Sequence, residues 1–155
     1  MQADVSAIHA FLRPSICNGN PNEQAQIRRW WHEEHSAKGR LIWEYPLFDC
    51  WLDAIWIPDA PCYGVEESGL KLPSRFPLRG QRIVVCEAKH RRVSASLIGQ
   101  ALVYGAFARR AGAIVDRTVV FAERVTPELA EIASELGLHV VAQSSAGRLQ
   151  HHTTC

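Results

Sequence analysis

The sequence predicts an α/β domain in which helices cover both faces of a mixed β-sheet. Two patterns alternate along the 155 residues: segments with apolar residues at helical spacing, and short runs rich in aromatic and β-branched residues. Their order, α-β-β-β-α-β-α-β, is typical of a mixed sheet between two helical layers. Because the length and the 47% of apolar residues suit one hydrophobic core, we expect a single domain over residues 1–155, with its core at about 22–142.

The first predicted elements are a helix and two strands. A break rich in Asn, Gly and Pro at 18–21 precedes a helix over 22–38. Residues 41–47 and 50–57 are rich in aromatic and branched side chains, which predicts two strands in a hairpin or meander. The predicted inner face of the helix follows i, i+3, i+4 and i+7 spacing and consists of Ile27, Trp30, Trp31 and Glu34.

The second half of the chain predicts strands that alternate with helices. The segment 58–80 is rich in proline and glycine, so we expect a long connection there rather than a core element. The polar segment 144–155 is expected to be a loose tail. Between them the patterns predict strands at 82–87, 118–122 and 139–142 and helices at 94–110 and 127–137.

Charge, cysteine content and hydropathy exclude several classes of protein. The formal net charge of +1 is not the strongly basic balance of a protein that coats nucleic acid, so basic residues have to be judged by position. The five cysteines show no C-x-x-C spacing and leave one over, which argues against a zinc ribbon or a disulfide framework and favours a reducing, cytoplasmic location. Because the start of the chain lacks a secretory signal and no apolar run reaches membrane-spanning length, we expect no membrane partner.

The predicted strand 82–87 ends in a carboxylate and an amine two residues apart. Because side chains alternate along a strand, Glu87 and Lys89 share one face, whereas Cys86 and Ala88 point to the other. An acid and a base therefore meet at one edge of the sheet. A Glu-x-Lys pair is also a common ion pair at a strand end, and these residues alone leave that alternative open.

A second carboxylate, Asp53, lies among apolar neighbours in the predicted strand 50–57. Burying such a group is costly unless it is paired or binds a metal ion. If Asp53 and Glu87 meet on neighbouring strands, they repel each other unless a divalent cation lies between them, and carboxylate oxygens suit Mg²⁺ or Mn²⁺. The alternative is an arginine partner for Asp53, which would remove the need for a metal ion.

The next predicted helix adds an amide and a phenol. Gln100 and Tyr104 are four residues apart and so share one face of the helix, from which both can point toward the end of the preceding strand. Such a pair is common on its own. The order Asp53, Glu87-x-Lys89 and Gln100-x-x-x-Tyr104, on strand, strand and following helix, favours one common site.

In these motifs and their order, the chain resembles the PD-(D/E)xK nuclease superfamily, which includes restriction endonucleases and Holliday-junction resolvases. The resemblance covers about residues 22–142, nearly the whole predicted domain. Gln100 and Tyr104 are similar to the Q-x-x-x-Y motif of the RecB-like exonuclease branch, in which an upstream histidine, here His32 or His35, is usual. The segment before Asp53 lacks the glycine of that branch, and Glu-x-Lys replaces its more usual Asp-x-Lys.

The resemblance implies a restriction-endonuclease-like fold and hydrolysis of DNA phosphodiester bonds with Mg²⁺ or Mn²⁺. Asp53, Glu87 and the carbonyl oxygen of Ala88 would hold the ion, which activates a water molecule. Lys89 would orient that water and stabilise developing negative charge. Gln100 and Tyr104 would position the substrate or the nucleophile.

Many members of the superfamily also place a glutamate on the first helix, directed at the metal ion. Glu34 is our candidate, because it shares the spacing of Ile27 and Trp30 and should face the sheet. The residues equally allow a carboxylate at the helix end in solvent. Glu34 would complete a second metal position.

Basic residues flank the predicted site in sequence and are candidates for contacts with DNA phosphates. They are Lys71, Arg75, Arg79, Arg82, Arg91 and Arg92. Each is also typical of a solubilising surface charge. Because a chain of this size offers little surface beyond a catalytic core, we expect a homodimer or a larger protein complex to supply specificity.

Two other functions remain open on the sequence. One is an accessory subunit with a nuclease-like fold that binds nucleic acid without cutting it, although the intact set of Asp53, Glu87 and Lys89 argues against this. The other is a protein-interaction module in which the acid and the amine form a structural salt bridge. The response to divalent ions separates an enzyme from such a module.

Overall fold

The structure is a computed structural model that describes residues 20–72, 77–143 and 149–152, the last four through their backbone alone. The predicted sequence of helices and strands is confirmed, and two short strands are added to it. In chain order the elements are α2 (Pro21–His35), β1 (Arg40–Leu47), β2 (Cys50–Ile57), β3 (Val65–Ser68), β4 (Arg82–Ala88), α3 (Ala95–Arg110), β5 (Ile114–Ala122), α4 (Pro127–Glu135), β6 (Leu138–Gln143) and β7 (Leu149–His152).

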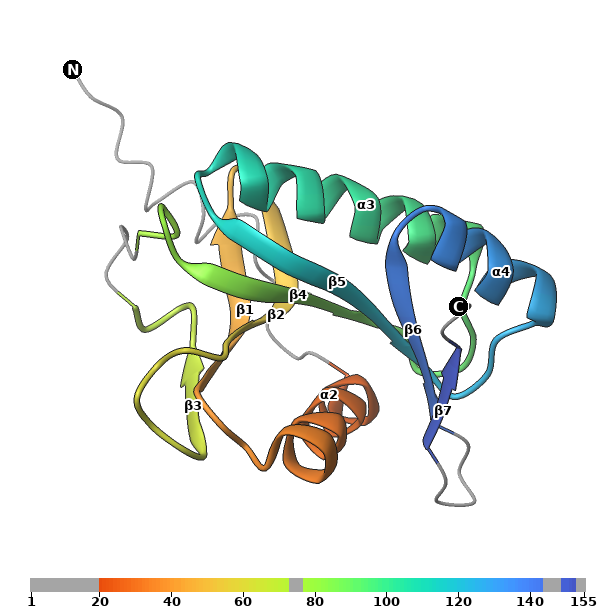
Figure 1. Cartoon of the computed structure of the whole chain (residues 1–155), viewed down its shortest axis with the longest axis horizontal. Coiled ribbons are helices and arrows are strands. Elements are labelled where there is room, and N and C mark those ends of the chain that lie inside the picture. Colours follow the sequence, from red (N-terminus) through yellow and green to blue (C-terminus); the bar gives the residue numbers. More distant parts are fainter. Residues whose placement is uncertain (1–19, 73–76, 144–148, 153–155) are drawn as a thin grey trace.

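Within these described residues, seven strands form one mixed sheet in the order β3-β1-β2-β4-β5-β6-β7. Strands β1, β2 and β4 pair antiparallel in succession, whereas β4, β5 and β6 run parallel to one another. Figure 1 shows α3 and α4 on one face of the sheet and α2 on the opposite face. The fold is therefore α/β with a mixed sheet flanked by helices, as the sequence predicts.

Two sequence predictions are wrong in detail. The connection 58–80 contains β3, which pairs parallel with β1, and Arg28 of α2 holds Glu66 of β3 through two nitrogens at 2.8 Å. In the tail, residues 149–152 form β7, which pairs antiparallel with β6. Both strands lie at the margins of the sheet, where pairing with a neighbour organises a segment that has little apolar pattern of its own.

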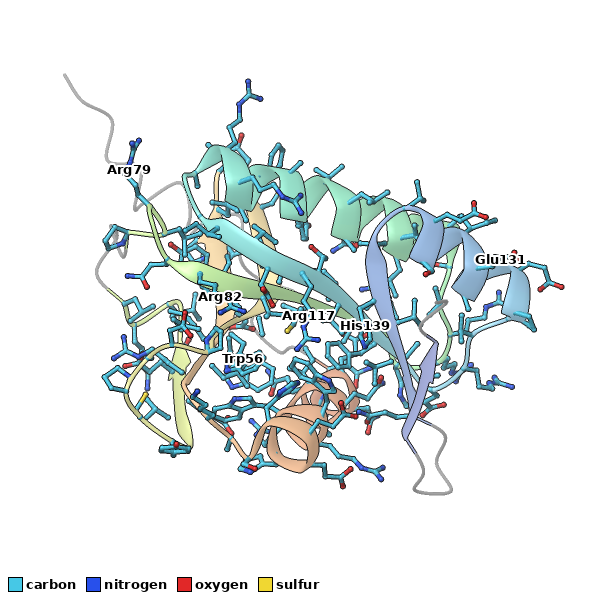
Figure 2. All side chains as sticks on the ribbon, in the orientation of Figure 1. Trp56, Arg79, Arg82, Arg117, Glu131 and His139 are labelled. Atoms are coloured by element: carbon cyan, nitrogen blue, oxygen red, sulfur yellow. The ribbon has the colours of Figure 1, made fainter. Side chains whose placement is uncertain are left out.

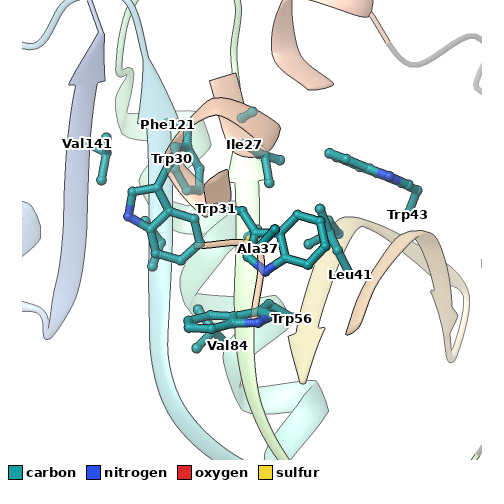
Figure 3. Packing of buried hydrophobic residues seen from close by; sticks show 14 residues of the cluster. Ile27, Trp30, Trp31, Ala37, Leu41, Trp43, Trp56, Val84, Phe121 and Val141 are labelled. Carbon is teal, nitrogen blue, oxygen red and sulfur yellow. The ribbon is translucent and has the colours of Figure 1, made fainter. Parts of the chain in front are cut away.

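The face of the sheet under α2 is built around aromatic side chains. Trp30 and Trp31 of α2 are almost fully buried, and Trp30 meets Trp56 and Phe121 edge-to-face at 5.5 and 5.3 Å between ring centroids. Figure 3 shows these rings packed between α2 and strands β2, β4 and β5. This packing confirms that Trp30 and Trp31 lie on the inner face of the helix, and it places Trp56 in the same core cluster.

Side chains of β4 alternate between the two faces of the sheet. Val84, Cys86 and Ala88 pack in the cluster under α2, whereas Ile83 and Val85 pack on the α3 face. By the same alternation Glu87 points toward α3. The apolar strand thereby places a carboxylate, fully buried at 0% exposure, directly beneath a helix.

The ends of the three helices follow local capping chemistry. The side chains of Asn20, Ser94 and Thr126 accept hydrogen bonds from the first-turn amides of α2, α3 and α4, respectively. No helix within the described residues is long and apolar enough to cross a membrane. Among the cysteines in that part of the chain, Cys50, Cys62 and Cys86 are free thiols.

Candidate active site at the end of strand β4

The structure brings Asp53 and Glu87 together on adjacent strands. Ala54 of β2 pairs with Cys86 of β4, so the residues beside this pair, Asp53 and Glu87, are neighbours across the two strands. The Asp53 amide donates to Glu87 Oε1 at 3.2 Å, and the Ala88 amide donates to Asp53 Oδ2 at 2.8 Å. Each carboxylate is therefore fixed by the backbone of the strand that carries the other.

A local break in the β1–β2 ladder frees the backbone of Asp53 for this contact. Pairs form at Trp43–Ala54 and Tyr45–Leu52, but the pair between them, Glu44 opposite Asp53, is missing. Glu44 has a positive φ of 50°, which turns its peptide out of the ladder. Asp53 has no paired residue in either neighbouring ladder, and its amide donates to Glu87 Oε1.

Gly69, just beyond β3, packs directly against this irregular point. Its amide donates to the carbonyl oxygen of Trp43 at 2.6 Å, and a Cβ on Gly69 would lie 2.4 Å from the carbonyl oxygen of Glu44. Only glycine fits against the strand here. The unpredicted strand β3 thus delivers a glycine that allows close approach beside the candidate site.

The two carboxyl groups hold protons more strongly than isolated ones. Burial raises the pKa of Asp53 from 3.8 to about 6, although the Ala88 amide and the Lys89 charge oppose the shift. Burial, and then the charge of Asp53, raise the pKa of Glu87 well above its usual value. The side-chain hydrogen bond between the two groups raises the pKa of Glu87 and lowers that of Asp53, which favours one proton held on the pair where no cation is bound.

The amide and the phenol of α3 lie where the sequence predicts. Gln100 Nε2 donates to Glu87 Oε2 at 3.2 Å and also lies 3.3 Å from the Tyr104 hydroxyl. Burial, followed by the charge of Glu87, raises the pKa of Tyr104 to about 12, so the phenol is neutral near pH 7 and can donate a proton in a hydrogen bond. Gln100 therefore links Glu87 to Tyr104 in one chain of polar groups.

Lys89 is exposed just after the end of β4, with its amide bound to the carbonyl oxygen of Phe121. Its ammonium lies close enough to lower the pKa of both Asp53 and Glu87. The three residues at the centre of the sequence prediction thus converge. The lysine stands on the solvent side of two carboxyl groups that lie deeper.

The helix glutamate at the site is Glu23, not the predicted Glu34. Glu23 Oε1 accepts a hydrogen bond from the His90 amide at 3.2 Å, and its charge adds to the rise in the pKa of Asp53. Gln26 Nε2 also donates to the carbonyl oxygen of Lys89 at 3.2 Å, which places the start of α2 over the end of β4.

Glu34 is exposed in the last turn of α2, where His35 lies 3.5 Å from Arg117 of β5. Arg117 pairs with Val84, near the beginning of β4, so this end of the helix lies away from Glu87. The eleven residues from Glu23 to Glu34 correspond to about 16 Å along a helix. Glu34 is therefore a surface carboxylate, and the prediction that it binds metal is wrong.

The predicted phosphate-binding residues separate into distinct places. Arg91 and Arg92 are exposed shortly after Lys89, and Lys71 is exposed beyond β3. Arg79 and Arg82 instead lie where β4 begins (Figure 2), and Arg82 contacts Asp116 at 3.0 Å. Because Arg82 precedes Glu87 by about 16 Å of strand, these two arginines lie away from Asp53 and Glu87, and their contact with phosphates stays a prediction.

Arg75, the remaining predicted contact for phosphate, lies outside the described residues.

A divalent ion fits this donor set. Within 20–72 and 77–143, no three His, Cys, Asp or Glu side chains gather as a ready-made cage, so the protein side would be the pair Asp53 and Glu87. Mg²⁺ commonly takes one or two carboxylates and completes its octahedron with waters and substrate oxygens. A buried Glu87 beside a partly buried Asp53, with a proton held on the pair, is the sort of site in which a cation can replace that proton.

Comparisons of the chain with protein-family models, with curated proteins and with solved structures gave no match.

Proposed function

We propose that the chain is a metal-dependent nuclease that hydrolyses phosphodiester bonds in DNA. The observation that carries the proposal is the Asp53–Glu87 pair, fixed by backbone amides, with Gln100 behind it and Lys89 in front. A structural salt bridge explains this arrangement poorly, because the closest contacts of Glu87 are another carboxyl group, an amide and a side-chain amide. We propose further that the fold is restriction-endonuclease-like, with β1, β2, β4, α3 and β5 as its core.

A divalent ion bound by Asp53 and Glu87, with the Ala88 carbonyl oxygen, would polarise the phosphate and lower the pKa of a bound water. The residues of the chain then have separate tasks. The Ala88 and Asp53 amides hold the two carboxylates in place, which fixes the position of the ligand oxygens. The Lys89 ammonium, exposed at the opening, orients the attacking water and stabilises the negative charge that builds on the phosphate oxygens.

The side chains behind the pair keep its geometry and charge correct. Gln100 donates to Glu87 and so favours the ionised carboxylate that a metal ion needs. Tyr104, neutral near pH 7, serves as a hydrogen-bond donor and not as a general base. Glu23 adds a third carboxylate at the rim, from which it could accept a proton from a metal-bound water or hold a second ion.

The free thiols bear on the cellular location of the protein, and the exposed arginines bear on the charge of its substrate. Free Cys50, Cys62 and Cys86 suit a reducing compartment, and we propose that the enzyme acts in the cytoplasm. The exposed arginines beside Lys89 suit a polyanionic substrate. A homodimer or a larger complex remains our proposal for the source of substrate specificity.

A cleavage assay tests the proposal. The protein is incubated with linear duplex, supercoiled circular, single-stranded and branched DNA in Mg²⁺, in Mn²⁺ and in EDTA. We expect metal-dependent cleavage of at least one substrate that is lost in Asp53→Asn and retained in Asp116→Asn, a matched change at the other end of the same sheet.

Circular dichroism of each variant shows that the fold is intact. Binding of DNA without cleavage in any metal would instead identify the non-cleaving accessory subunit. If the protein neither binds nor cleaves DNA and its melting temperature does not respond to Mn²⁺, the result would favour the protein-interaction module with a structural salt bridge.

A further inference from the structure

Two arginines lie side by side on the two loops that follow β4 and β5. Arg92 and Arg124 form an isolated parallel β-bridge, and the surrounding backbone reinforces it: the Arg124 amide donates to the Arg91 carbonyl oxygen at 3.1 Å, and the Val93 amide donates to the Arg124 carbonyl oxygen at 2.9 Å. The bridge extends the β4–β5 pairing past the end of both strands. It therefore fixes the two backbones at neighbouring positions.

Both arginine side chains point outward from this bridge. Val93 is buried, Val125 packs partly buried, and both face the cluster under α3 and α4. Because side chains alternate along paired segments, Arg92 and Arg124 lie on the other face, and both are exposed. Two exposed arginines therefore lie at neighbouring backbone positions on the same face of the bridge.

Within the described residues, no carboxylate forms a salt bridge with either arginine. The neighbouring acid, Glu123, contacts His90 Nδ1 at 3.4 Å instead. Like charges directly opposite each other in a sheet destabilise it. The arrangement thus has an electrostatic cost that a bound anion would remove.

The position of this pair relative to the candidate active site indicates which anion. Arg92 follows Lys89 by three residues, which span at most about 11 Å of chain. By the alternation that directs Glu87 toward α3, the pair lies on the α2 side of the sheet, so a DNA strand that contacts both places would pass over the end of β4. The amino terminus of α3, which has no acidic residue in its first turn, begins just beyond Arg92 and adds to the positive potential there.

We propose that Arg92 and Arg124 together bind the phosphate backbone of the DNA strand, one or two nucleotides from the bond that is cut. The inference rests on the proposed nuclease function and adds Arg124, which has no apolar pattern or motif in the sequence to mark it. The contact is with phosphates and reads no base sequence. It holds the strand in register while Lys89 and the metal site act on the scissile group.

The test is the salt dependence of DNA binding, measured by fluorescence anisotropy in EDTA so that no metal-dependent cleavage occurs. Each lost phosphate contact lowers the slope of log affinity against log salt by about 0.9 for duplex DNA and about 0.7 for a single strand. We expect a fall of this size in Arg124→Ala and in Arg92→Ala. Arg110→Ala is the matched control, because Arg110 is exposed in the last turn of α3, about 22 Å along the helix from its first residue, Ala95.

A second variant separates a binding role from a structural one. Arg124→Glu places opposite charges across the bridge, so we expect a higher melting temperature of the free protein together with weaker DNA binding than in Arg124→Ala. A lower melting temperature with an unchanged salt slope would overturn the inference.

The inference and the proposed function fail in different ways. If the protein cuts DNA but Arg124→Ala keeps the slope of wild type and of Arg110→Ala, the inference is wrong and the nuclease stands. If the slope falls as expected but no substrate is cut in Mg²⁺ or Mn²⁺, the arginine contact stands and the nuclease is wrong. Absence of DNA binding by the wild-type protein would overturn the arginine contact, and the cleavage assay then decides the function separately.

Discussion

Charged residues lie at both ends of β4, but their surroundings are opposite. At the beginning they are exposed and paired with opposite charges, whereas at the end a buried carboxyl group lies beside another carboxyl group. At the beginning of the strand, Arg82 is half exposed and contacts Asp116 at 3.0 Å and Asp59 at 4.0 Å. At its end, Glu87 is fully buried and meets Asp53, a group of the same charge. The first end is a solvated ion pair that a folded surface forms at little cost. The second is a like-charge pair that the fold tolerates only with a shared proton or a cation.

The difference shows how a candidate functional site can be recognised among many charged residues. A sheet of this size carries ion pairs at several places, including Arg28–Glu66 and Arg40–Glu67 beside β3. All of these join opposite charges. Carboxyl groups gathered away from water, with backbone amides aimed at them, have the perturbed pKa values that are typical of candidate functional positions. The predictions below test this contrast, from the largest expected effect to the smallest.

The largest effect is expected from removal of the positive charge in front of the pair. Lys89→Ala should lower the rate of DNA cleavage by about 10²–10³-fold, the usual loss when one group that stabilises developing charge is removed. Arg82→Ala, the cation at the other end of β4, should leave the rate within about twofold of wild type. Single-turnover cleavage at saturating Mg²⁺ measures both. Equal rates in the two variants would contradict the distinction between the ends of the strand.

Gln100 should matter for metal affinity more than for folding. Gln100→Ala removes the hydrogen bond to Glu87 Oε2, and loss of such a supporting contact weakens metal binding by about 10–100-fold. Ser96→Ala, an exposed change on the same helix, is the control. Titration with Mn²⁺ compares the dissociation constants. An unchanged constant in Gln100→Ala would show that the amide does not support the carboxylate.

The stability of the metal-free protein should fall as the pH rises through the titration of the pair. The folded-state pKa of Asp53 is about 6 against 3.8 in a model peptide, so between these values the native state holds a proton that the unfolded chain has lost. The raised pKa of Glu87 extends the window upward. The contribution of the pair is thus complete at low pH and is lost as the pH passes the folded values.

Urea unfolding in EDTA at pH 5 and pH 8 measures this effect. From pH 5 to pH 8, the free energy of unfolding of Glu87→Gln should rise relative to that of wild type. The expected difference is about 1–2 kcal/mol after allowance for the partial exposure of Asp53. Mn²⁺ should reverse the trend in wild type, because the ion binds the deprotonated carboxylates. If the free energy of unfolding of wild type instead rises relative to that of the variant from pH 5 to pH 8 without metal, the raised pKa values are contradicted.

The smallest effect is expected at the exposed ion pair. Asp116→Asn should change the free energy of unfolding by less than about 1 kcal/mol, because both partners are largely solvated. The change should also shrink further in 1 M salt. Urea unfolding provides the measurement, and a loss of several kcal/mol would show that the beginning of β4 depends on this pair.

The sequence predicts the elements and residues that follow from local pattern. Asp53, Glu87 and Gln100 lie in segments with strong strand or helix periodicity. Counting residues along each segment therefore predicts the face of the strand or helix on which each side chain lies. Strand alternation and helical spacing then bring them to one point, as the hydrogen bonds between them confirm. Local periodicity determines which way a side chain faces, and this was sufficient for the centre of the site.

Features that depend on pairing with distant segments were not predicted. Strand β3 has the sequence Val-Glu-Glu-Ser, without apolar alternation, and owes its conformation to β1 and to the ion pairs with Arg28 and Arg40. Strand β7 is likewise formed by pairing with β6. The positive φ of Glu44, which turns the Asp53 amide toward Glu87, has no signal in the sequence either.

The replacement of the predicted Glu34 by Glu23 shows most clearly what helical spacing cannot determine. Glu23 precedes Ile27 by four residues, and Glu34 follows it by seven, so both fit the same helical stripe. Spacing alone does not reveal which end of α2 lies over the end of β4. The contact of Gln26 with the Lys89 carbonyl oxygen shows that the beginning of α2 lies over the end of β4. Glu23, which lies in that first turn, is therefore the helix glutamate at the candidate site.

Mn²⁺ binding at equilibrium tests most directly whether Asp53 and Glu87 form a metal site. Isothermal titration at pH 8 compares wild type with Glu87→Gln and with the control Asp116→Asn, after circular dichroism has shown that all three are folded. The account predicts a Mn²⁺ site in wild type and in Asp116→Asn that is lost in Glu87→Gln. Binding of equal affinity in all three proteins, or no binding in wild type, would contradict it.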